Sequence, residues 1–405
     1  MSAAGLPTRA GRAWPLAETE LLKIGRGALA PPFRVMDMIT AANTRQAALA
    51  PGAPHVLRME VGQPGAGAPA GAVEAAVAAL RGGSSLGYTE ALGRPSLRAR
   101  IARHAADWYG HAPDPAGIAI TMGASAAFPL AFLAAFDPGD RVALTAPYYP
   151  PYVNILTALG LVPVILQADA TTRYQPTPAM LDAIDPPPDG LIIASPSNPA
   201  GTMLLPDELA AICAWCDARG VRLVSDEIYH GLQHARPIAT AAAYSPHAIV
   251  VNSFSKYFCM TGWRVGWMVL PEELRRPVEC LAQNMFISAS HVGQVAAEAA
   301  MDCTSELEAN VAGYRRSRDV LLAALPGAGF PDVAAADGAF YLYADVSRRT
   351  QDSAEFCARL LHEAGIAAAA GADFDAVRGH GTVRLSYCGP EADMAAAAGR
   401  FAGFA

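Results

Sequence analysis

The stretch "AIVVNSFSKYFCMTGWRVGW", residues Ala248 to Trp267, places a lysine shortly after a run that has the composition of a buried strand. Apolar and β-branched residues over 248–252 favour a strand covered on both faces. Lys256 follows that strand, and a lysine in apolar surroundings is costly unless its amine is covalently engaged or paired. The stretch therefore predicts a buried strand with a functional amine beyond its carboxyl end. Taken alone, Lys256 is equally compatible with a surface lysine whose stem lies along apolar residues.

A regular alternation of two kinds of segment extends outward from this stretch, between about Ile118 and Val269. Short β-branched runs alternate with segments of helical apolar spacing, among them "ASAAFPLAFLAAF" and "PDELAAICAWCDAR". The strand-like runs are "IAITM", "RVALT", "VPVIL", "GLIIAS", "VRLVSD", "AIVVNS" and "RVGWMVL". This alternation predicts an α/β fold, a three-layer domain whose mostly parallel sheet is covered by helices on both faces. Ligands of such sheets bind beyond the carboxyl ends of the strands.

Beyond this block, the chain turns mostly helical from Pro271 to about Leu325. A second, small α+β unit follows, with strand-like "AFYLYADV" and "GTVRLSYC" around the helical "SAEFCARLLHEAG". The portion up to about Pro54 has no strand pattern, and we expect it to pack on the C-terminal unit or on a partner subunit. We therefore predict three parts: an N-terminal arm with part of a small domain (1–54), a large ligand-binding domain (55–305) and a small C-terminal domain (306–405).

Composition argues against several classes of function. The 405 residues carry a net charge of −7, with 30 Lys and Arg against 37 Asp and Glu and no basic run, so nothing predicts nucleic-acid binding. The first residues, "MSAAGLPTRAGRAWPLAETELL", contain no apolar signal core, and no later run is long enough to span a bilayer. We therefore expect a cytoplasmic protein. Cys213 and Cys216 form a CxxC pair, but their helical spacing and the absence of a second pair argue against a metal site.

Polar residues follow several of the predicted strands. Gly123, Ala124 and Ser125 lie where a strand gives way to a helix, and free N–H groups there favour an anion such as phosphate. Asn198 lies in the proline-bounded loop "SPSNPAG", and Asp226 ends the strand in "VRLVSDEIYHG". Each signal also has an ordinary interpretation, since strand-to-helix turns are common and an Asp before a helix or turn is often its N-cap.

The combination of these residues is more specific than its parts. Ser253 and Arg264 flank Lys256, and hydroxyl groups, an arginine fork and the turn at 123–125 together make a phosphate site. A lysine that can form a Schiff base, a carboxylate such as Asp226 for a cationic ring nitrogen, and a phosphate cup are together typical of pyridoxal 5′-phosphate. The sequence therefore predicts an enzyme that uses this cofactor.

With these motifs, the chain resembles the class I/II, fold-type I family of pyridoxal-phosphate-dependent aminotransferases, in its aspartate-aminotransferase-like subgroup. The resemblance runs from "MEVGQPG" to "VRLSYC" and rests on "GYTEALGRPSLR", "PSNPAGT", "SDEIY" and "SFSKYFCMTGWRVGW", in the family's order and spacing. It implies a homodimer that moves an amino group between an L-amino acid and a 2-oxo acid. The implied mechanism is ping-pong, through Schiff-base intermediates.

The resemblance also implies a role for each residue that matches the family's motifs. Lys256 would form the Schiff base and move the substrate proton, and Asp226 would keep the pyridine nitrogen protonated. Tyr229 and Asn198 would hydrogen-bond the phenolic oxygen of the cofactor. Tyr149, in "APYYPPY", would stack on the face of the ring.

Two further groups of roles follow from the same resemblance. The residues expected to hold the phosphate are Gly123, Ala124, Ser125, Ser253 and Arg264. Tyr88, in "GYTEALG", would reach the phosphate of the neighbouring subunit, so that two subunits share each active site. Arg384, in "VRLSYC", would pair with the substrate α-carboxylate, helped by Gly62 and Asn198. Read without the family, Arg384 is equally compatible with a solubility residue of an edge strand.

Two departures from the family's pattern bear on function. Ala200 replaces the more usual threonine in "NPAG". Ser125 stands where some aspartate-preferring bacterial members carry a lysine for the distal carboxylate, which weakens an assignment to aspartate and leaves the amino donor open. A pyridoxal-phosphate-dependent C–S lyase of the same fold remains an alternative. A non-enzymatic regulator is a third, but the roughly fifty residues before "MEVGQPG" show neither a basic face nor a helix-turn-helix pattern.

Overall fold

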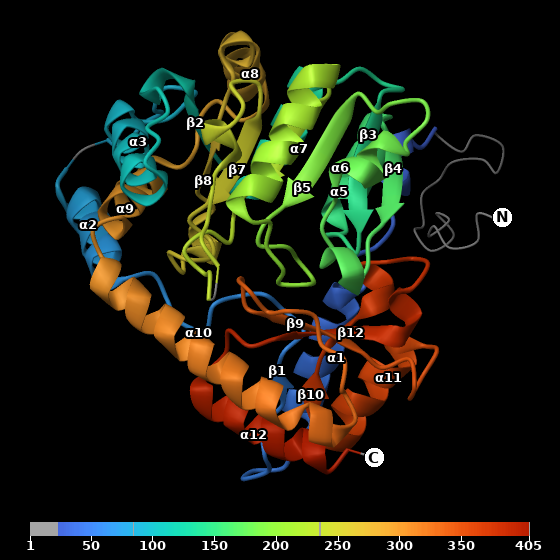
Figure 1. Cartoon of the computed structure of the whole chain (residues 1–405). Coiled ribbons are helices and arrows are strands. Elements are labelled where there is room, and N and C mark those ends of the chain that lie inside the picture. The colour runs from blue at the N-terminus through green and yellow to red at the C-terminus, as the bar shows by residue number, and fades with distance from the viewer. Residues whose placement is uncertain (1–22, 84, 235, 405) are drawn as a thin grey trace, which may run out of the picture.

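In the computed structural model, which describes residues 23–83, 85–234 and 236–404, a seven-stranded sheet runs in the order β2–β8–β7–β6–β5–β3–β4 (Figure 1). The strands are β2 (Ile118–Thr121), β3 (Arg141–Ala146), β4 (Val162–Gln167), β5 (Gly190–Ala194), β6 (Arg222–Asp226), β7 (Ile249–Ser253) and β8 (Gly266–Val269). Neighbours from β7 to β4 are parallel, which confirms the predicted α/β fold with a mostly parallel sheet. Strand β8 is antiparallel to both β7 and β2, because a loop without a crossover helix connects it to β7.

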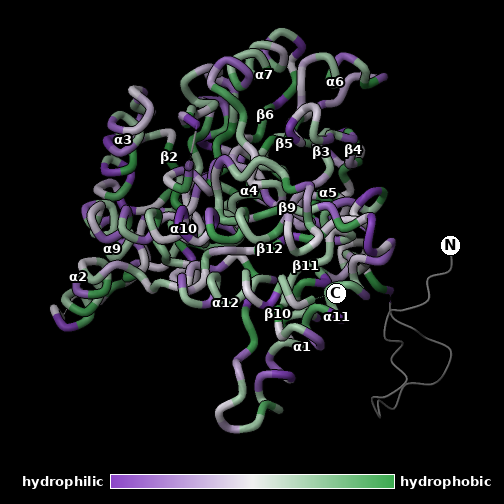
Figure 2. The backbone as a smooth tube through the Cα atoms, turned by 60° about the horizontal axis from the view of Figure 1, so that its bottom comes forward, coloured by the Kyte–Doolittle hydropathy of each residue, from purple (hydrophilic) through white to green (hydrophobic). Residues whose placement is uncertain are grey.

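Successive strand residues pack into two separate cores, one on each face of this sheet. The helices α4 (Ala124–Ala135), α5 (Pro151–Leu159) and α8 (Glu272–Met285) cover one face, and α6 (Pro178–Asp182) and α7 (Pro206–Arg219) cover the other. In β5, Ile192 packs on the first side, whereas Leu191 and Ile193 pack on the second. Figure 2 shows hydrophobic residues along the central strands β5 and β6. Because the helices cover both faces of the sheet, the carboxyl ends of its strands form an uncovered edge.

A long helix links this large unit to a second, smaller one. The helices beside β2 are α2 (Ala70–Arg81), α3 (Pro95–Tyr109) and α9 (His291–Ala300). Helix α10 (Thr304–Ala324) starts beside them and runs down along the second unit to its far end (Figure 1). The helical stretch predicted after Pro271 is therefore found as α8, α9 and α10.

The second unit contains a small antiparallel sheet in the order β11–β12–β9. Its strands and helices are β9 (Tyr341–Asp345), β11 (Ala369–Ala370), β12 (Thr382–Ser386), α11 (Ser353–Arg359) and α12 (Glu391–Ala402). Strand β12 lies between its two neighbours, so Arg384 is on a central strand and the edge-strand interpretation is wrong.

The N-terminal portion packs on this second unit. Helix α1 (Val35–Ala47) begins with Val35 against Phe374 and continues with Ala42 against Leu361. Strand β1 (Leu57–Arg58) pairs in parallel with β10 (Ile366–Ala367). The predicted division of the chain into domains at residues 54/55 and 305/306 stays a proposal. Residues 1–22, the stretch that contains no apolar signal core, lie outside the described part of the chain.

Two expectations from composition concern the described residues directly. No helix among them has the length and apolar character needed to cross a membrane. Cys213 and Cys216 are buried on α7 in the core beneath the sheet, and burial raises the pKa of each thiol to about 12. Thiols that hold their protons so firmly are poor nucleophiles and poor metal ligands.

Candidate active site

A cavity of about 690 Å³ lies beyond the carboxyl ends of β5, β6 and β7, where the two units meet. Most of the predicted site residues line it: Gly62, Ala124, Ser125, Tyr149, Asn198, Asp226, Tyr229, Ser253, Lys256, Arg264 and Arg384. Gly123 and Tyr88 do not line it. The cavity therefore gathers side chains from the large unit, from β12 and from the segment that follows β1.

Lys256 lies in the loop between β7 and β8 with its amine in this cavity. Its Nζ donates a hydrogen bond to the Gly62 carbonyl oxygen at 2.7 Å. The pKa of the Lys256 amine is lowered from 10.5 to about 8, mainly by burial and also by the nearby guanidinium groups of Arg384 and Arg264. An amine with such a pKa loses its proton close to neutral pH, which a nucleophile or a proton carrier requires.

Asp226 ends β6 and is buried, with 3% of its surface exposed. Its carboxylate accepts hydrogen bonds from the Tyr152 hydroxyl and from the Ile228 amide, the latter at 3.1 Å. Burial raises the pKa of Asp226 to about 6, and the hydrogen bonds from Tyr152 and Ile228 oppose this rise. A turn follows Asp226 over 228–231, and the hydrogen bond from the Ile228 amide caps this turn, so the carboxylate also has the ordinary capping role. A buried carboxylate that points into a cavity is suited to a cationic partner.

The turn before α4 forms a cradle for an anion. Gly123 has a φ of +75°, and a side chain there would place its Cβ 2.6 Å from Nη2 of Arg264. Arg264 donates from Nη2 to the Ser125 hydroxyl at 3.3 Å, and no side chain caps the first N–H groups of α4. The hydroxyl of Ser253 lies in the same cavity wall. Free helix N–H groups, two hydroxyls and one guanidinium fit a phosphate group.

Arg384 is the most unusual side chain of the cavity, because it is a buried cation without an anion. Its residue is 2% exposed, and no carboxylate among the described residues forms an ion pair with it. The guanidinium lies between the rings of Tyr341 and Phe374, 4.5 and 4.7 Å from their centroids. It donates to Asn198 Oδ1 at 2.9 Å and to the Glu60 carbonyl oxygen, while its Nε has no partner. A buried fork with a free donor indicates a site for a carboxylate.

Tyrosines complete the wall between these groups. The hydroxyls of Tyr229 and Tyr341 lie 2.8 Å apart, and a Cβ on Gly62 would collide with the Tyr341 hydroxyl. Tyr149 lies edge-on to Tyr152, with ring centroids 5.5 Å apart. Glycine at position 62 therefore leaves room for the Tyr341 ring at the floor of the cavity.

Sequence reasoning missed two residues that shape the site. Tyr152 lies in the first turn of α5, three positions after Tyr149 in the tyrosine-rich "YYPPY", and this local signal was available in the sequence. Tyr341 gave no such signal, because only the packing of β9 against the large unit brings it beside Tyr229.

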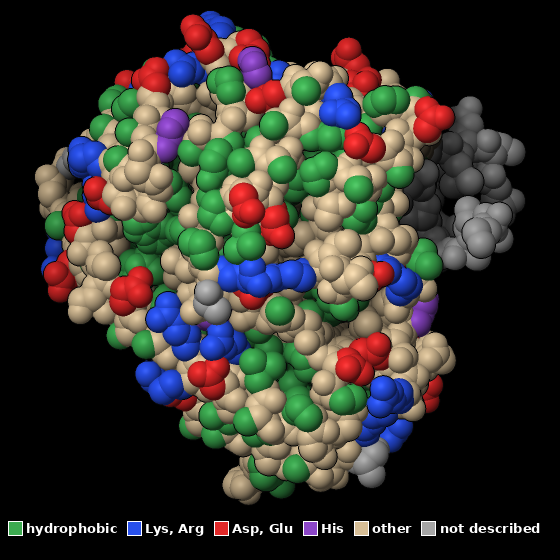
Figure 3. Space-filling model, in the orientation of Figure 1, with side chains coloured by type: hydrophobic (Ala, Val, Ile, Leu, Met, Phe, Trp, Pro, Cys, Tyr) green, Lys and Arg blue, Asp and Glu red, His purple; other side chains and the backbone are tan. Residues whose placement is uncertain are grey.

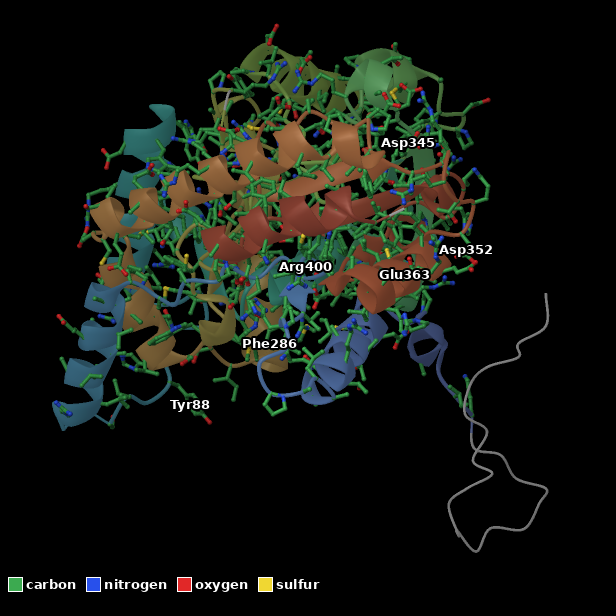
Figure 4. The ribbon with its side chains drawn as sticks, turned by 90° about the horizontal axis from the view of Figure 1, so that it is seen from below. Tyr88, Phe286, Asp345, Asp352, Glu363 and Arg400 are labelled. Carbon is green, nitrogen blue, oxygen red and sulfur yellow. The ribbon has the colours of Figure 1, made fainter. Side chains whose placement is uncertain are left out.

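Tyr88 lies apart from the cavity, on the loop between α2 and α3. It is 82% exposed, and Figure 4 shows its side chain pointing away from the ribbon. Exposed apolar residues accompany it on the neighbouring elements: Val73, Val77, Leu80, Met285 and Ile287. No contact within the described chain connects Tyr88 to the cavity.

Comparison with known proteins identifies what this architecture is similar to. The family model described as aminotransferase class I and II matches residues 54–401. The valine–pyruvate aminotransferase of Mycobacterium tuberculosis is 48% identical over 368 residues, which cover 90% of this chain and 94% of that protein. An aspartate aminotransferase of Streptomyces avermitilis is 32% identical, covering 84% of this chain and 86% of the relative.

Solved structures of aminotransferases are also similar to this chain. A crystal structure of an aminotransferase from Mycobacterium tuberculosis superposes with a TM-score of 0.92 at 46% identity, covering 95% of this chain and 99% of that one. The aspartate aminotransferase of Thermus thermophilus with maleate superposes with a TM-score of 0.88 at 30% identity, covering 95% and 100%.

Proposed function

This chain belongs to the class I and II family of aminotransferases, and from that premise we propose that it moves the amino group of valine, or of a similarly apolar L-amino acid, to pyruvate. The pyridoxal 5′-phosphate dependence and the transaminase activity expected from the sequence are confirmed by the family and its named relatives. Those relatives do not favour the C–S lyase alternative.

One observation carries the choice of substrate: the basic residues that line the cavity are Lys256, Arg264 and Arg384. The first two belong to the proposed cofactor site, and Arg384 is left for the α-carboxylate. Among the described residues that line the cavity, no further Lys or Arg remains for a second carboxylate, and an unpaired buried carboxylate is costly. Apolar side chains also line the cavity, among them Phe33, Val35, Phe128 and Ile155.

The cofactor site follows from the cavity residues. When bound, pyridoxal 5′-phosphate supplies a carbonyl carbon for the substrate amine and a ring that takes up electron density from Cα. Lys256 would hold the cofactor through its amine and carry the proton that leaves the substrate Cα. Asp226, oriented by Tyr152, would keep a proton on the ring nitrogen. The turn at 123–125 with Ser253 and Arg264 would hold the phosphate.

The substrate would be oriented by the opposite wall. Arg384 offers a fork to the α-carboxylate, and Asn198 and the glycine backbone at 62 lie beside it. Asn198 and Tyr229 would also hydrogen-bond the phenolic oxygen of the cofactor, and Tyr149 would lie on the face of its ring. Together these contacts would align the Cα–H bond with Lys256.

A donor and acceptor panel tests the substrate proposal. We expect the highest kcat/KM for valine with pyruvate, and a value lower by on the order of a hundredfold for aspartate with 2-oxoglutarate. Ammonia release from an S-alkyl cysteine should stay at background. A preference for the dicarboxylic pair would contradict the proposed substrate class, although not the transaminase activity.

We also propose that the active sites are shared in a homodimer, with Tyr88 reaching the partner's phosphate. Its support is the 82% exposure of Tyr88 and the exposed apolar face of α2 beside it. Tyr88→Ala should weaken cofactor affinity, and mixing that variant with Lys256→Ala should restore one intact composite site per exchanged dimer. An active monomer in sedimentation, or no recovery after proven subunit exchange, would reject this arrangement. The cytoplasmic location stays a prediction.

A further inference from the structure

Asp337 lies at the junction of the two units, in the segment that leads into β9, and it does not line the cavity. The residue is 7% exposed, so its carboxylate needs partners. Figure 3 shows Lys and Arg side chains gathered along this junction, between the upper and lower parts of the molecule. The family comparisons and the proposed catalytic set give Asp337 no role.

The carboxylate of Asp337 collects donors from three separate segments of the large unit. Arg173, which follows β4, donates from Nη2 to Oδ2. Arg236, beyond the turn after β6, donates from Nε to Oδ1 at 3.1 Å. The backbone amide of Met203, beyond β5, donates to Oδ2 at 3.2 Å. The Asp337 side chain, from the second unit, therefore accepts hydrogen bonds from the segments that follow β4, β5 and β6 of the large unit.

Backbone contacts around Asp337 reinforce this link. Its carbonyl oxygen accepts a hydrogen bond from the His234 amide at 2.7 Å, and the Gly338 amide donates to the Gly201 carbonyl oxygen at 3.0 Å. Gly201 has a φ of +69°, and a Cβ there would lie 2.9 Å from the Tyr341 carbonyl oxygen. The main chains of the two units are thus in direct contact, which only a glycine at 201 permits.

The segments that meet at Asp337 contain residues that surround the proposed α-carboxylate site. Asn198, three positions before Gly201, accepts the hydrogen bond from Arg384. Tyr341, four positions after Asp337, contacts the Tyr229 hydroxyl. We propose that Asp337 is a positioning residue of the reaction, which holds Asn198 and Tyr341 in the register that the substrate carboxylate requires.

Removal of the carboxylate has a predictable physical consequence. Arg173 and Arg236, whose side chains are 25% and 29% exposed, would be left as two neighbouring cations without their common anion. The Met203 amide would lose its acceptor. Both effects loosen the loop with Asn198, while Lys256 and Asp226 keep their hydrogen bonds to Gly62, Tyr152 and Ile228.

The test compares Asp337→Ala and Asp337→Asn with Asp182→Ala in the cofactor-loaded enzyme. Asp182 accepts from Trp215 Nε1 and from Arg219, both at 2.8 Å, and lies away from the cavity, so it controls for a lost Asp–Arg contact. For Asp337→Ala we expect the KM for valine and for pyruvate to rise by on the order of tenfold to a hundredfold, because small displacements of positioning groups have large effects. Cofactor content and kcat should change less, and Asp337→Asn should lie between Asp337→Ala and the unchanged protein.

Hydrogen exchange gives a readout that does not depend on turnover. A peptide that contains the Met203 amide should exchange faster in Asp337→Ala than in the unchanged protein, and should be unaffected in Asp182→Ala. If Asp337→Ala does not fold, Arg236→Gln removes one donor and should still raise the KM for valine severalfold. KM values within twofold of the unchanged protein, with only a lower Tm as in Asp182→Ala, would overturn the proposal.

This inference rests on the proposed α-carboxylate site, and the two can fail separately. If the unchanged protein does not use valine, the same KM comparison is made with the donor that the panel identifies. Failure of the substrate proposal then appears in the unchanged protein, whereas failure of the positioning role appears as equal KM values in the variants.

Discussion

The two walls of the cavity are built in different ways. The proposed cofactor wall consists of residues at or shortly beyond the ends of β5, β6 and β7, just before β8 and at the start of α4, so the neighbouring strand or helix places these side chains. The substrate wall brings together Arg384 from the middle of β12, Tyr341 from β9 and Phe33 from the segment before α1. Local structure fixes the first wall, and packing between distant parts of the chain fixes the second. Changes on the two walls should therefore have different signatures.

The largest effect is expected on the cofactor wall, from Lys256→Ala. Multiple turnover should be abolished, because in the proposed mechanism the amine both holds the cofactor and carries the substrate proton. The variant should still bind the cofactor without a covalent bond, since the phosphate cradle and Asp226 are intact. Borohydride reduction and peptide mapping should find the cofactor on Lys256 in the unchanged protein. Normal turnover of the variant, or reduction onto another lysine, would refute the assignment.

A smaller effect is expected from Tyr152→Phe, which removes one hydrogen bond to Asp226 and leaves the substrate wall untouched. We expect kcat to fall by about tenfold, since a hydrogen bond to a charged group is worth about 1.5–3 kcal/mol. The Tyr152 hydroxyl lowers the pKa of Asp226, so its loss should move the acidic limb of the pH–rate profile to higher pH. The KM for valine should stay the same. A raised KM with an unshifted profile would place Tyr152 on the substrate wall instead.

The smallest effect concerns stability without the cofactor. Burial raises the pKa of Asp226 from 3.8 to about 6, so its ionised form destabilises the cofactor-free fold above about pH 6 and not below about pH 4. Asp226→Asn should therefore raise the Tm of the cofactor-free protein by a few degrees at pH 8, and leave it unchanged at pH 4. Thermal melts at both pH values measure this. A Tm that falls at pH 8 would mean that the carboxylate stabilises the fold by itself.

The contrast between the walls also explains what the sequence predicts. The hydrophobic periodicity of the sequence predicts the strands of the central sheet. The ends of those strands predict an open edge of the sheet with Asp226, Asn198 and Lys256 at it. The reversed direction of β8 does not, because its short apolar run looks the same in either direction. Arg384 was identified through family resemblance, since a mid-strand arginine has the same local pattern whether it faces solvent or a cavity. Tyr341 was missed because its neighbour Tyr229 is 112 positions away.

Single-turnover titration of the cofactor-loaded enzyme tests the division between the walls most directly. Valine is added to the unchanged protein and to Arg384→Lys, and the loss of the absorbance of the lysine-bound cofactor is followed. The account predicts the same starting spectrum and cofactor content for both, with half-saturation by valine at a concentration on the order of a hundredfold higher in the variant, because a lysine cannot replace the fork. An altered starting spectrum with unchanged valine affinity would contradict it, since Arg384 would then belong to the cofactor wall.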